Sequence, residues 1–325
     1  MTSANPSRPS TAAVATALLT VYVVWGSTYL GIAIMIETLP PLLAAGVRYV
    51  VAGLLMLGAL AAYHRFRRRT EPAERPAAVH WRSAFVIGTL LLLGGNGGVV
   101  LSELFITSGI AAVLVGTMPI WMALFDAILS RRMPSSLVIG GLVAGFVGVA
   151  ILVWPVEGID RIDPLGIGLV IVADISWAAG SLYARRAPLP RSPLLGTGME
   201  MLAGGIMLVL AGSLIGEIGR TNVEEFSLRS LLALAYLIVF GSIAAFTAYT
   251  WLLANVPVST VSTYAYVNPI VAVALGAVIL SEPITPRRLI ATAIILAAVV
   301  AMVSGRPREV EEPRPARGAP ELEPE

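Results

Sequence analysis

The sequence predicts an all-α polytopic membrane protein with ten transmembrane helices, arranged as two inverted repeats of five helices each. Three observations support this fold class: the composition, the number of long apolar runs, and residues that recur about 152 positions apart. Of the 325 residues, 57% are hydrophobic and 13% are charged, whereas a soluble domain carries about 25% charged residues. A soluble chain of this length could not bury so much apolar surface, so most of the chain is expected to lie in lipid.

The apolar runs define the predicted helices. A membrane-crossing helix needs roughly 20 mostly apolar residues, and ten such runs follow one another at 12–35, 41–62, 83–104, 108–130, 135–154, 164–184, 194–216, 229–252, 258–281 and 286–304. The first run lacks the charged leader and cleavage site of a secretory signal, so it is expected to be an uncleaved span. The polar ends, 1–11 and 305–325, are expected to be disordered tails.

The arginines predict the orientation. All 22 basic residues are arginine. With ten spans both termini lie on one side, and that side receives 16 of the arginines, including the cluster in "HRFRRR" at 64–69, whereas the other side receives five. Because basic loops stay in the cytoplasm, both termini are expected to be cytoplasmic.

The recurring residues divide the chain into repeats at 12–154 and 164–304. The pairs are Trp25 with Trp177, Arg48 with Glu200 and Gly53 with Gly205, each 152 positions apart, and Pro119 with Pro269, 150 positions apart. Five spans is an odd number, so the second repeat enters the membrane upside down. Inverted repeats of this kind are typical of secondary transporters, whose substrate site lies near the midplane between the copies.

Pro119 and Pro269 lie inside two of the predicted spans. A proline in a helix removes one hydrogen bond and kinks the backbone, which frees the carbonyls of Val115 and Ala265. We predict one kinked, gating helix in each repeat. The alternative is that both prolines merely set packing angles.

Arg48 and Glu200 are ionisable residues within spans, where each costs roughly 2.5–3.5 kcal/mol on insertion scales. Each is about 10 Å deep at 1.5 Å per residue, but they enter from opposite surfaces, so a direct ion pair is not expected. They are candidate substrate-pathway residues, with Arg48 as the partner of a substrate carboxylate. Alternatively, each side chain extends to its nearer surface.

Asp174 is the deepest acid, close to the midplane of its span, and Trp177 lies one turn further along the same helical face. An acid beside an aromatic ring suits a cationic or amine-bearing substrate. It could equally be a proton-coupling carboxylate, or a structural acid that is hydrogen-bonded to a neighbour.

The remaining substrate-pathway candidates are an amide among glycines, an amide before a proline, and aromatic residues: Asn96, Asn268, Trp25, Tyr29, Tyr264 and Tyr266. The glycine-rich stretch at 91–100 either packs closely against another helix or unwinds and offers backbone groups to a substrate. The aromatic residues either line a pocket or anchor the protein at the membrane surfaces.

Several function classes are disfavoured by the sequence. It contains no cysteine, and its two histidines, His64 and His80, share one loop, so no metal site is expected. It has no phosphate loop for ATP, and neither an HExxH nor a GxSxG motif. We therefore expect no enzyme activity, no cofactor and no nucleic-acid partner. An intramembrane enzyme and a non-transporting sensor or partner remain the alternatives, although the longest loop, at 63–82, is too short for a folded soluble domain.

Three stretches together resemble the EamA-type transporters of the drug/metabolite transporter superfamily: "WGSTYLGIAI", "ETLPPLLAAGVRYVVAGLLML" and "TYAYVNPIVAVALGAVILSEPIT". The resemblance covers 12–304 and implies ten helices, cytoplasmic termini and a bacterial inner-membrane exporter of small metabolites. The family's acidic residue at the end of span nine is matched by Ser281-Glu282, but the equivalent place in the first repeat reads Arg131-Arg132. In span seven many members carry an uncharged amide where this chain has Glu200.

The expected function is secondary active transport by alternating access, with a small metabolite such as an amino acid or a related compound as the cargo. The expected partners are this substrate, membrane lipid and either a coupled proton or, for a uniporter, no coupling ion. A zwitterion needs both signs of charge in one cavity, which favours amino-acid-like cargo. The oligomeric state is not predicted.

Overall fold

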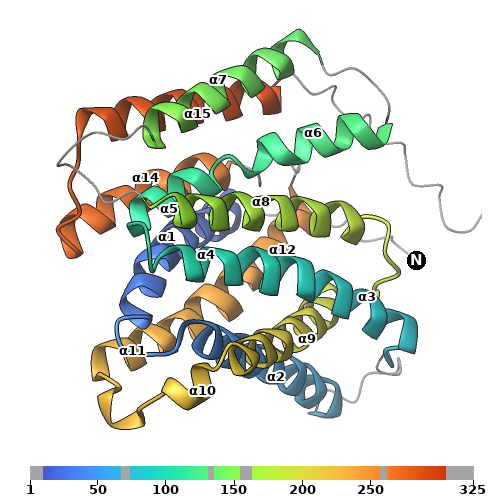
Figure 1. The fold of residues 1–325 in the computed structure, drawn as a ribbon. Helices are drawn as coiled ribbons and strands as arrows, with labels where there is room; N and C mark the ends of the chain where they lie inside the picture. The colour runs from blue at the N-terminus through green and yellow to red at the C-terminus, as the bar shows by residue number, and fades with distance from the viewer. Residues whose placement is uncertain are drawn as a thin grey trace, which may run out of the picture.

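The structure is a computed structural model that describes residues 10–66, 74–130, 135–153, 163–256, 261 and 263–304. Within these ranges the chain forms helices and no strand (Figure 1). The two predicted tails lie almost wholly outside the described residues. The predicted fold class is confirmed in its coarser part, because the protein is all-helical with several apolar helices of membrane-crossing length.

The first half of the chain forms α1 (Thr11–Met35), α2 (Pro41–Phe66), α3 (Ala78–Gly88), η1 (Thr89–Asn96), α4 (Gly97–Ser102), α5 (Ser108–Val115), α6 (Met118–Ser130) and α7 (Ser136–Val153). The second half forms α8 (Pro164–Ala184), α9 (Pro193–Leu214), α10 (Glu217–Arg220), η2 (Val223–Glu225), α11 (Leu228–Tyr236), η3 (Leu237–Ala244), α12 (Ala245–Asn255), α14 (Tyr264–Ile279) and α15 (Pro286–Ser304). Six stretches are long and apolar enough to cross a membrane: Thr11–Met35, Pro41–Phe66, Ala78–Ser102, Pro164–Ala184, Pro193–Leu214 and Leu228–Leu252.

The helix starts follow local sequence signals. Proline is the first residue of α2, α8, α9 and α15, where its missing N–H costs nothing and its fixed φ suits a helix. Ser10 and Asp163 precede helices, and their side-chain oxygens accept hydrogen bonds from the N–H groups of Ala13 and Leu165. Such caps satisfy donors that a helix start otherwise leaves unpaired.

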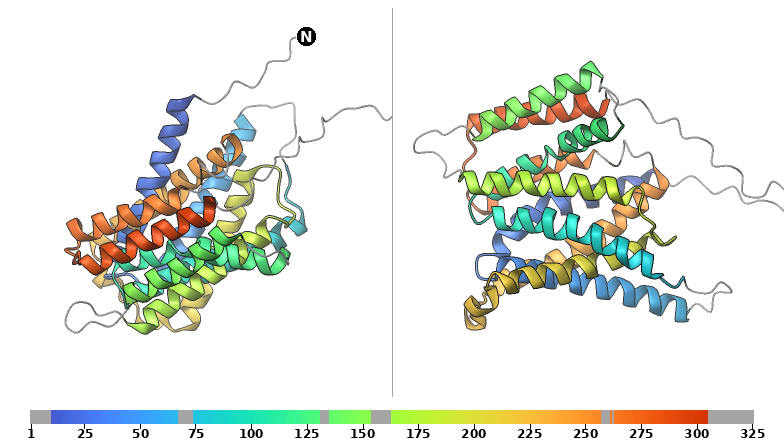
Figure 2. Two further views of the ribbon diagram at one scale, coloured as in Figure 1. Left: turned by 90° about the horizontal axis from the view of Figure 1, so that it is seen from above. Right: turned by 45° about the vertical axis from the view of Figure 1, so that its right-hand side comes forward.

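Two helix pairs form opposite edges of the bundle, α2 with α9 and α7 with α15, and the other long helices lie between them (Figures 1 and 2). Glycines let α2 and α9 approach closely. A Cβ atom on Gly46 would lie 2.9 Å from the carbonyl oxygen of Gly205, and one on Gly53 would lie 2.9 Å from that of Gly198. No side chain fits between the two backbones at these points.

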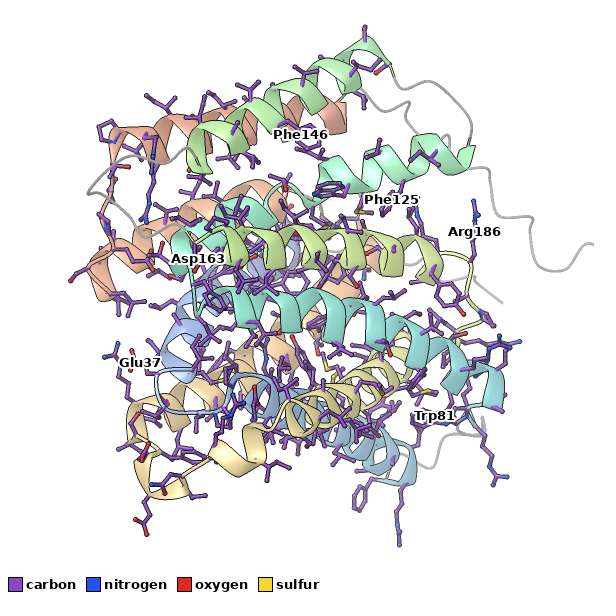
Figure 3. All side chains as sticks on the ribbon, viewed as in Figure 1. Glu37, Trp81, Phe125, Phe146, Asp163 and Arg186 are labelled. Carbon is purple, nitrogen blue, oxygen red and sulfur yellow. The ribbon has the colours of Figure 1, made fainter. Side chains whose placement is uncertain are left out.

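The outward faces of the helices are apolar. On α7 the exposed large side chains are Leu137, Ile139, Val143, Phe146 and Val147. Figure 3 shows Phe146 on this edge helix, Glu37 and Asp163 at one end of the bundle, and Trp81 and Arg186 at the other. We call these the Glu37 end and the Arg186 end. An apolar belt between two polar ends is what a bilayer requires.

Two π-helices interrupt long helices at corresponding places. η1 continues α3 into α4, and η3 continues α11 into α12, and each comprises eight residues. A π-helix holds an extra residue per turn, and such bulges often occur at functional sites. Of the sequence alternatives for 91–100, the structure shows close packing: a Cβ atom on Gly98, in α4, would lie 2.9 Å from that of Ala173, and the stretch up to Asn96 is π-helical rather than unwound.

The two prolines that the sequence analysis singles out, Pro119 and Pro269, occupy different positions in their helices. Pro269 lies inside α14, as predicted. The span that contains Pro119 is instead broken at Gly116 and Thr117, and Pro119 is the second residue of α6. A proline in a first turn forms no kink because its N–H would be unpaired in any case, so the prediction of a kink at Pro119 is corrected to a break before it. The break meets the other proline, since a Cβ atom on Gly116 would lie 3.2 Å from Cγ of Pro269.

Candidate functional site

Arg48 is a buried cation in the interior of the bundle. Arg48 is 3% exposed, so its side chain does not extend to a membrane surface. Nε donates to Oγ of Ser242 at 2.9 Å, and the guanidinium carbon lies 4.7 Å from the centroid of the Tyr49 ring. Nη1 is buried and meets no acceptor among the described residues. A buried guanidinium without a carboxylate partner is costly, so its presence needs a reason.

Each π-helix is contacted by one of the two tryptophans that recur 152 positions apart in the sequence. Nε1 of Trp25, on α1, donates to the carbonyl oxygen of Gly241 in η3 at 3.2 Å. Trp177, on α8, packs on Gly95 in η1, where an added Cβ atom would lie 2.7 Å from its ring. Next to Trp177, the Ser176 hydroxyl donates to the Leu90 carbonyl at 2.8 Å. Each tryptophan therefore packs on a glycine of the other half of the chain.

An aromatic cluster surrounds Trp25. The rings of Phe246, Tyr249 and Tyr264 each have their centroids 5.1 Å from that of Trp25. This cluster brings together two of the predicted pathway residues, Trp25 and Tyr264. Tyr266 also lies on α14, but its side chain is outside the described residues.

Asp174 lies in the interior of α8 and is 2% exposed. Its Oδ2 accepts a hydrogen bond of 3.0 Å from Oγ1 of Thr117, which lies in the break between α5 and α6. Tyr29, one turn after Trp25, is close enough to Asp174 and Glu103 to interact with both electrostatically. The acid is thus buried beside the helix break and opposite α1.

Glu200 is not brought to Arg48. Among the described residues no ion pair joins the two side chains, in agreement with the sequence prediction. Glu200 is half-buried on α9, and its carbonyl oxygen would be 2.6 Å from a Cβ atom on Gly88. Its backbone therefore packs tightly against α3.

The two predicted amides have different surroundings. Asn268 is 7% exposed, and in the orientation that satisfies its amide, Nδ2 donates to the carbonyl oxygens of Tyr22 and Tyr264, both at 3.2 Å. It thus ties α14 to α1. Asn96 ends η1, and its buried Oδ1 meets no donor among the described residues.

Three carboxylates cap helices that are distant in the sequence, and the sequence reasoning missed this role. Glu217 accepts from the N–H groups of Leu42 and Leu43 at 3.0 and 2.8 Å. Glu74 accepts from the N–H groups of Arg191 and Ser192, and the first of these bonds is the main reason that the pKa of Glu74 lies below its usual value. Glu282 caps α5 in the same manner. For Glu217 and Glu282 the sequence signal was an acid just beyond an apolar run, whereas Glu74 follows its run only after a polar loop.

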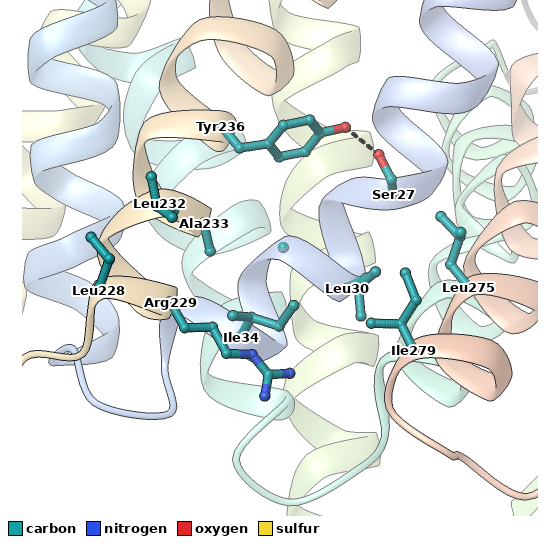
Figure 4. A pocket seen from close by; sticks show the side chains of 11 residues that line it. Ser27, Leu30, Ile34, Leu228, Arg229, Leu232, Ala233, Tyr236, Leu275 and Ile279 are labelled. Atoms are coloured by element: carbon teal, nitrogen blue, oxygen red, sulfur yellow. Dashed lines mark hydrogen bonds between the residues drawn. The ribbon is translucent and has the colours of Figure 1, made fainter.

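A cavity of about 600 Å³ lies between α1, α11 and α14 (Figure 4). Most of its lining is apolar, including Leu30, Ile34 and Leu275. At one side Tyr236 and Ser27 share a hydrogen bond, and at the other side Arg229 forms an ion pair of 3.3 Å with Glu37. The Tyr236 side adjoins η3, which carries the serine that binds Arg48.

Comparisons with known proteins agree with this architecture. The sequence model described as the EamA-like transporter family matches residues 12–154 and again 164–304. The uncharacterized inner membrane transporter YedA of Escherichia coli K12 is 38% identical over 291 residues, which cover 89% of this chain and 90% of YedA. The uncharacterized transporter YvbV of Bacillus subtilis 168 is 25% identical and covers 83% of this chain and 85% of YvbV. A solved crystal structure has a similar fold, with a TM-score of 0.59 at 18% identity over 91% of this chain and 96% of the other.

Proposed function

The chain belongs to the EamA-like transporter family, and from this premise we propose that it is a secondary active transporter that exports a small metabolite by alternating access. The proposed cargo is an amino acid or a related compound with a carboxylate. The observation that carries this proposal is the buried guanidinium of Arg48, whose Nη1 meets no acceptor among the described residues. A carboxylate on the cargo would supply the missing charge and hydrogen bonds.

The proposed architecture is ten spans in two inverted repeats, 12–154 and 164–304. Reciprocal contacts support it. With an offset of 152, Gly46 corresponds to Gly198 and Gly53 to Gly205, and each glycine of α2 packs on the equivalent of the other. A two-fold axis produces this pattern, in which i contacts j′ and j contacts i′.

Two further contacts have the same reciprocity. Trp25 packs on η3 and Trp177 on η1. The acid after α2, Glu74, caps the start of α9, and the acid after α9, Glu217, caps the start of α2. These reciprocal contacts support two halves that are built alike, which is the arrangement found in many transporters that work by alternating access.

The topology can be tested with introduced cysteines, because the chain has none of its own. We expect cysteines at Glu37 and Asp163 to react with a membrane-impermeant thiol reagent from outside the cell. Cysteines at Trp81 and Arg186 should react only after the membrane is permeabilised. Reaction of Glu37 and Arg186 variants from the same side would contradict the proposed arrangement of inverted halves in the inner membrane with cytoplasmic termini.

The roles of the remaining candidates follow from their places. The cluster around Trp25 would contact the uncharged part of the cargo, since aromatic rings bury much surface and attract cations. Asp174 would bind the amine or carry the coupled proton, because its only donor among the described residues is Thr117. Pro269, against the break at Gly116, would be the point at which the two halves bend.

Transport and coupling are tested together in liposomes that contain the purified protein and labelled amino acids. Counterflow of label would support transport and contradict the alternatives of an enzyme or a sensor. Replacing Asp174 by asparagine should abolish the pH dependence of transport, because the amide cannot exchange a proton, while Thr117 keeps an oxygen acceptor. Unchanged pH dependence in Asp174→Asn, at normal expression, would remove Asp174 from the coupling mechanism.

A further inference from the structure

Glu103 is a buried carboxylate that no role so far explains. Glu103 directly follows α4, and its backbone N–H donates a hydrogen bond to the carbonyl oxygen of Val99 in that helix. Each of its two carboxylate oxygens exposes less than 1 Å² and meets no hydrogen-bond donor among the described residues. A fully buried, unpartnered anion is among the most costly arrangements in a protein.

One of the groups around Glu103 makes its anionic form still more costly. The other carboxylate that acts on it is Glu282, which follows α14. The phenol of Tyr29, on α1, interacts electrostatically with both Glu103 and Asp174 of α8. From α15 Arg288 lies 4.0 Å from Glu282, and it donates to the carbonyl of Pro283 and to Oγ1 of Thr107.

Glu282 and Glu103 therefore differ in what satisfies them. Glu282 accepts three hydrogen bonds, from N and Oγ of Ser108 and from N of Gly109, and Arg288 lies beside it. Such a carboxylate is stable as an anion. Glu103 has none of these donors within the described part of the chain, so a bound cation must neutralise it. Because the two carboxylate oxygens of Glu103 are almost inaccessible, the cation that fits there is a proton.

We propose that Glu103 is a second proton-binding site of the transporter, distinct from Asp174, which holds its proton in the conformation described here. Opening of the Glu37 end would expose the carboxyl to water and let the proton leave, and closing would require it to be protonated again. This inference rests on the proposed function, because it gives Glu103 a place in the exchange of protons against cargo.

The test is the infrared spectrum of the full-length protein in lipid vesicles, which shows the carbonyl stretch of protonated carboxylic acids. We expect Glu103→Gln to lose one such band that the wild type has at neutral pH. The matched control is Glu217→Gln. Glu217 is also buried, but its carboxylate accepts two backbone hydrogen bonds, so its replacement should leave the band in place. An unchanged band in Glu103→Gln would overturn the proposal.

A second variant guards against a folding defect. If Glu103 is neutral and unpartnered, Glu103→Leu should melt at the same temperature as the wild type or higher, because removal of an unsatisfied buried polar group is neutral or stabilising. A clear fall in melting temperature would mean that Glu103 forms a structural interaction, and it would overturn the proposal as well. Neither measurement needs a cargo, so both bear on Glu103 alone, whereas a failure of counterflow bears on the proposed function.

Discussion

Replacing Arg48 by methionine should abolish transport and at the same time stabilise the protein. Removing one partner of a buried charge pair costs about 2–5 kcal/mol of binding, which at 1.4 kcal/mol per factor of ten is a loss of roughly 30-fold to several thousand-fold in affinity for the carboxylate-bearing cargo. Without cargo, however, Arg48 is 97% buried as a residue, and its Nη1 lacks an acceptor among the described residues. Methionine removes that cost, and a gain of about 1–4 kcal/mol is expected from comparable replacements.

The opposite signs make this prediction specific. Counterflow of labelled substrate in liposomes measures the first effect, and thermal unfolding in detergent measures the second. Arg229→Met is the matched control, because Arg229 is 55% exposed and pairs with Glu37 at the rim, where an ion pair contributes at most about 1 kcal/mol. If Arg48→Met unfolds more readily than the wild type, Arg48 is a structural residue and its assignment to the cargo is wrong.

The sequence predicted the helices well because lipid leaves few alternatives. Each backbone group in the membrane must be hydrogen-bonded within its own segment, so a long apolar run is a helix whatever it packs against. The α8 helix illustrates this, since the expected and observed ranges are both 164–184. The sequence did not decide whether Arg48 is buried, because an arginine side chain at a depth of about 10 Å can also reach the membrane surface.

Features that depend on distant contacts could not be predicted. The π-helices arise where Trp177 and Trp25 pack on glycines of the other half, and the sequence does not show that approach. The break before Pro119 replaces the predicted kink for a similar reason, because Thr117 in the break donates a hydrogen bond to Asp174, which lies 57 residues away in the sequence. Glu217 lies 174 and 175 residues from the N–H groups that it caps. Local sequence patterns predict where helices lie, but they do not show which helix ends contact one another in the folded protein.

The second large effect is expected at Glu282. Its turn is unusual, because Ser281 has φ 56° and the N–H of Glu282 bonds to the carbonyl of Gly276. This backbone shape aims the carboxylate at the start of α5, where it accepts three hydrogen bonds from Ser108 and Gly109 at 2.6 to 3.1 Å. An anion at a helix start also interacts favourably with the helix dipole.

Glu282→Ala should therefore lower the free energy of unfolding by about 3–5 kcal/mol, the usual cost of removing one partner of a buried, charge-assisted network. Three donors lose their acceptor, and Arg288, itself 5% exposed, loses the carboxylate at 4.0 Å. Glu217→Ala removes only two backbone bonds and should cost less, about 1–3 kcal/mol. Glu224→Ala, at an exposed site, should be close to neutral. Melting curves of the three variants in one detergent would rank their stabilities. If Glu282→Ala melts at the same temperature as the wild type, the hydrogen bonds of the cap contribute no more than water would supply in their place. In that case packing alone holds α5 in position.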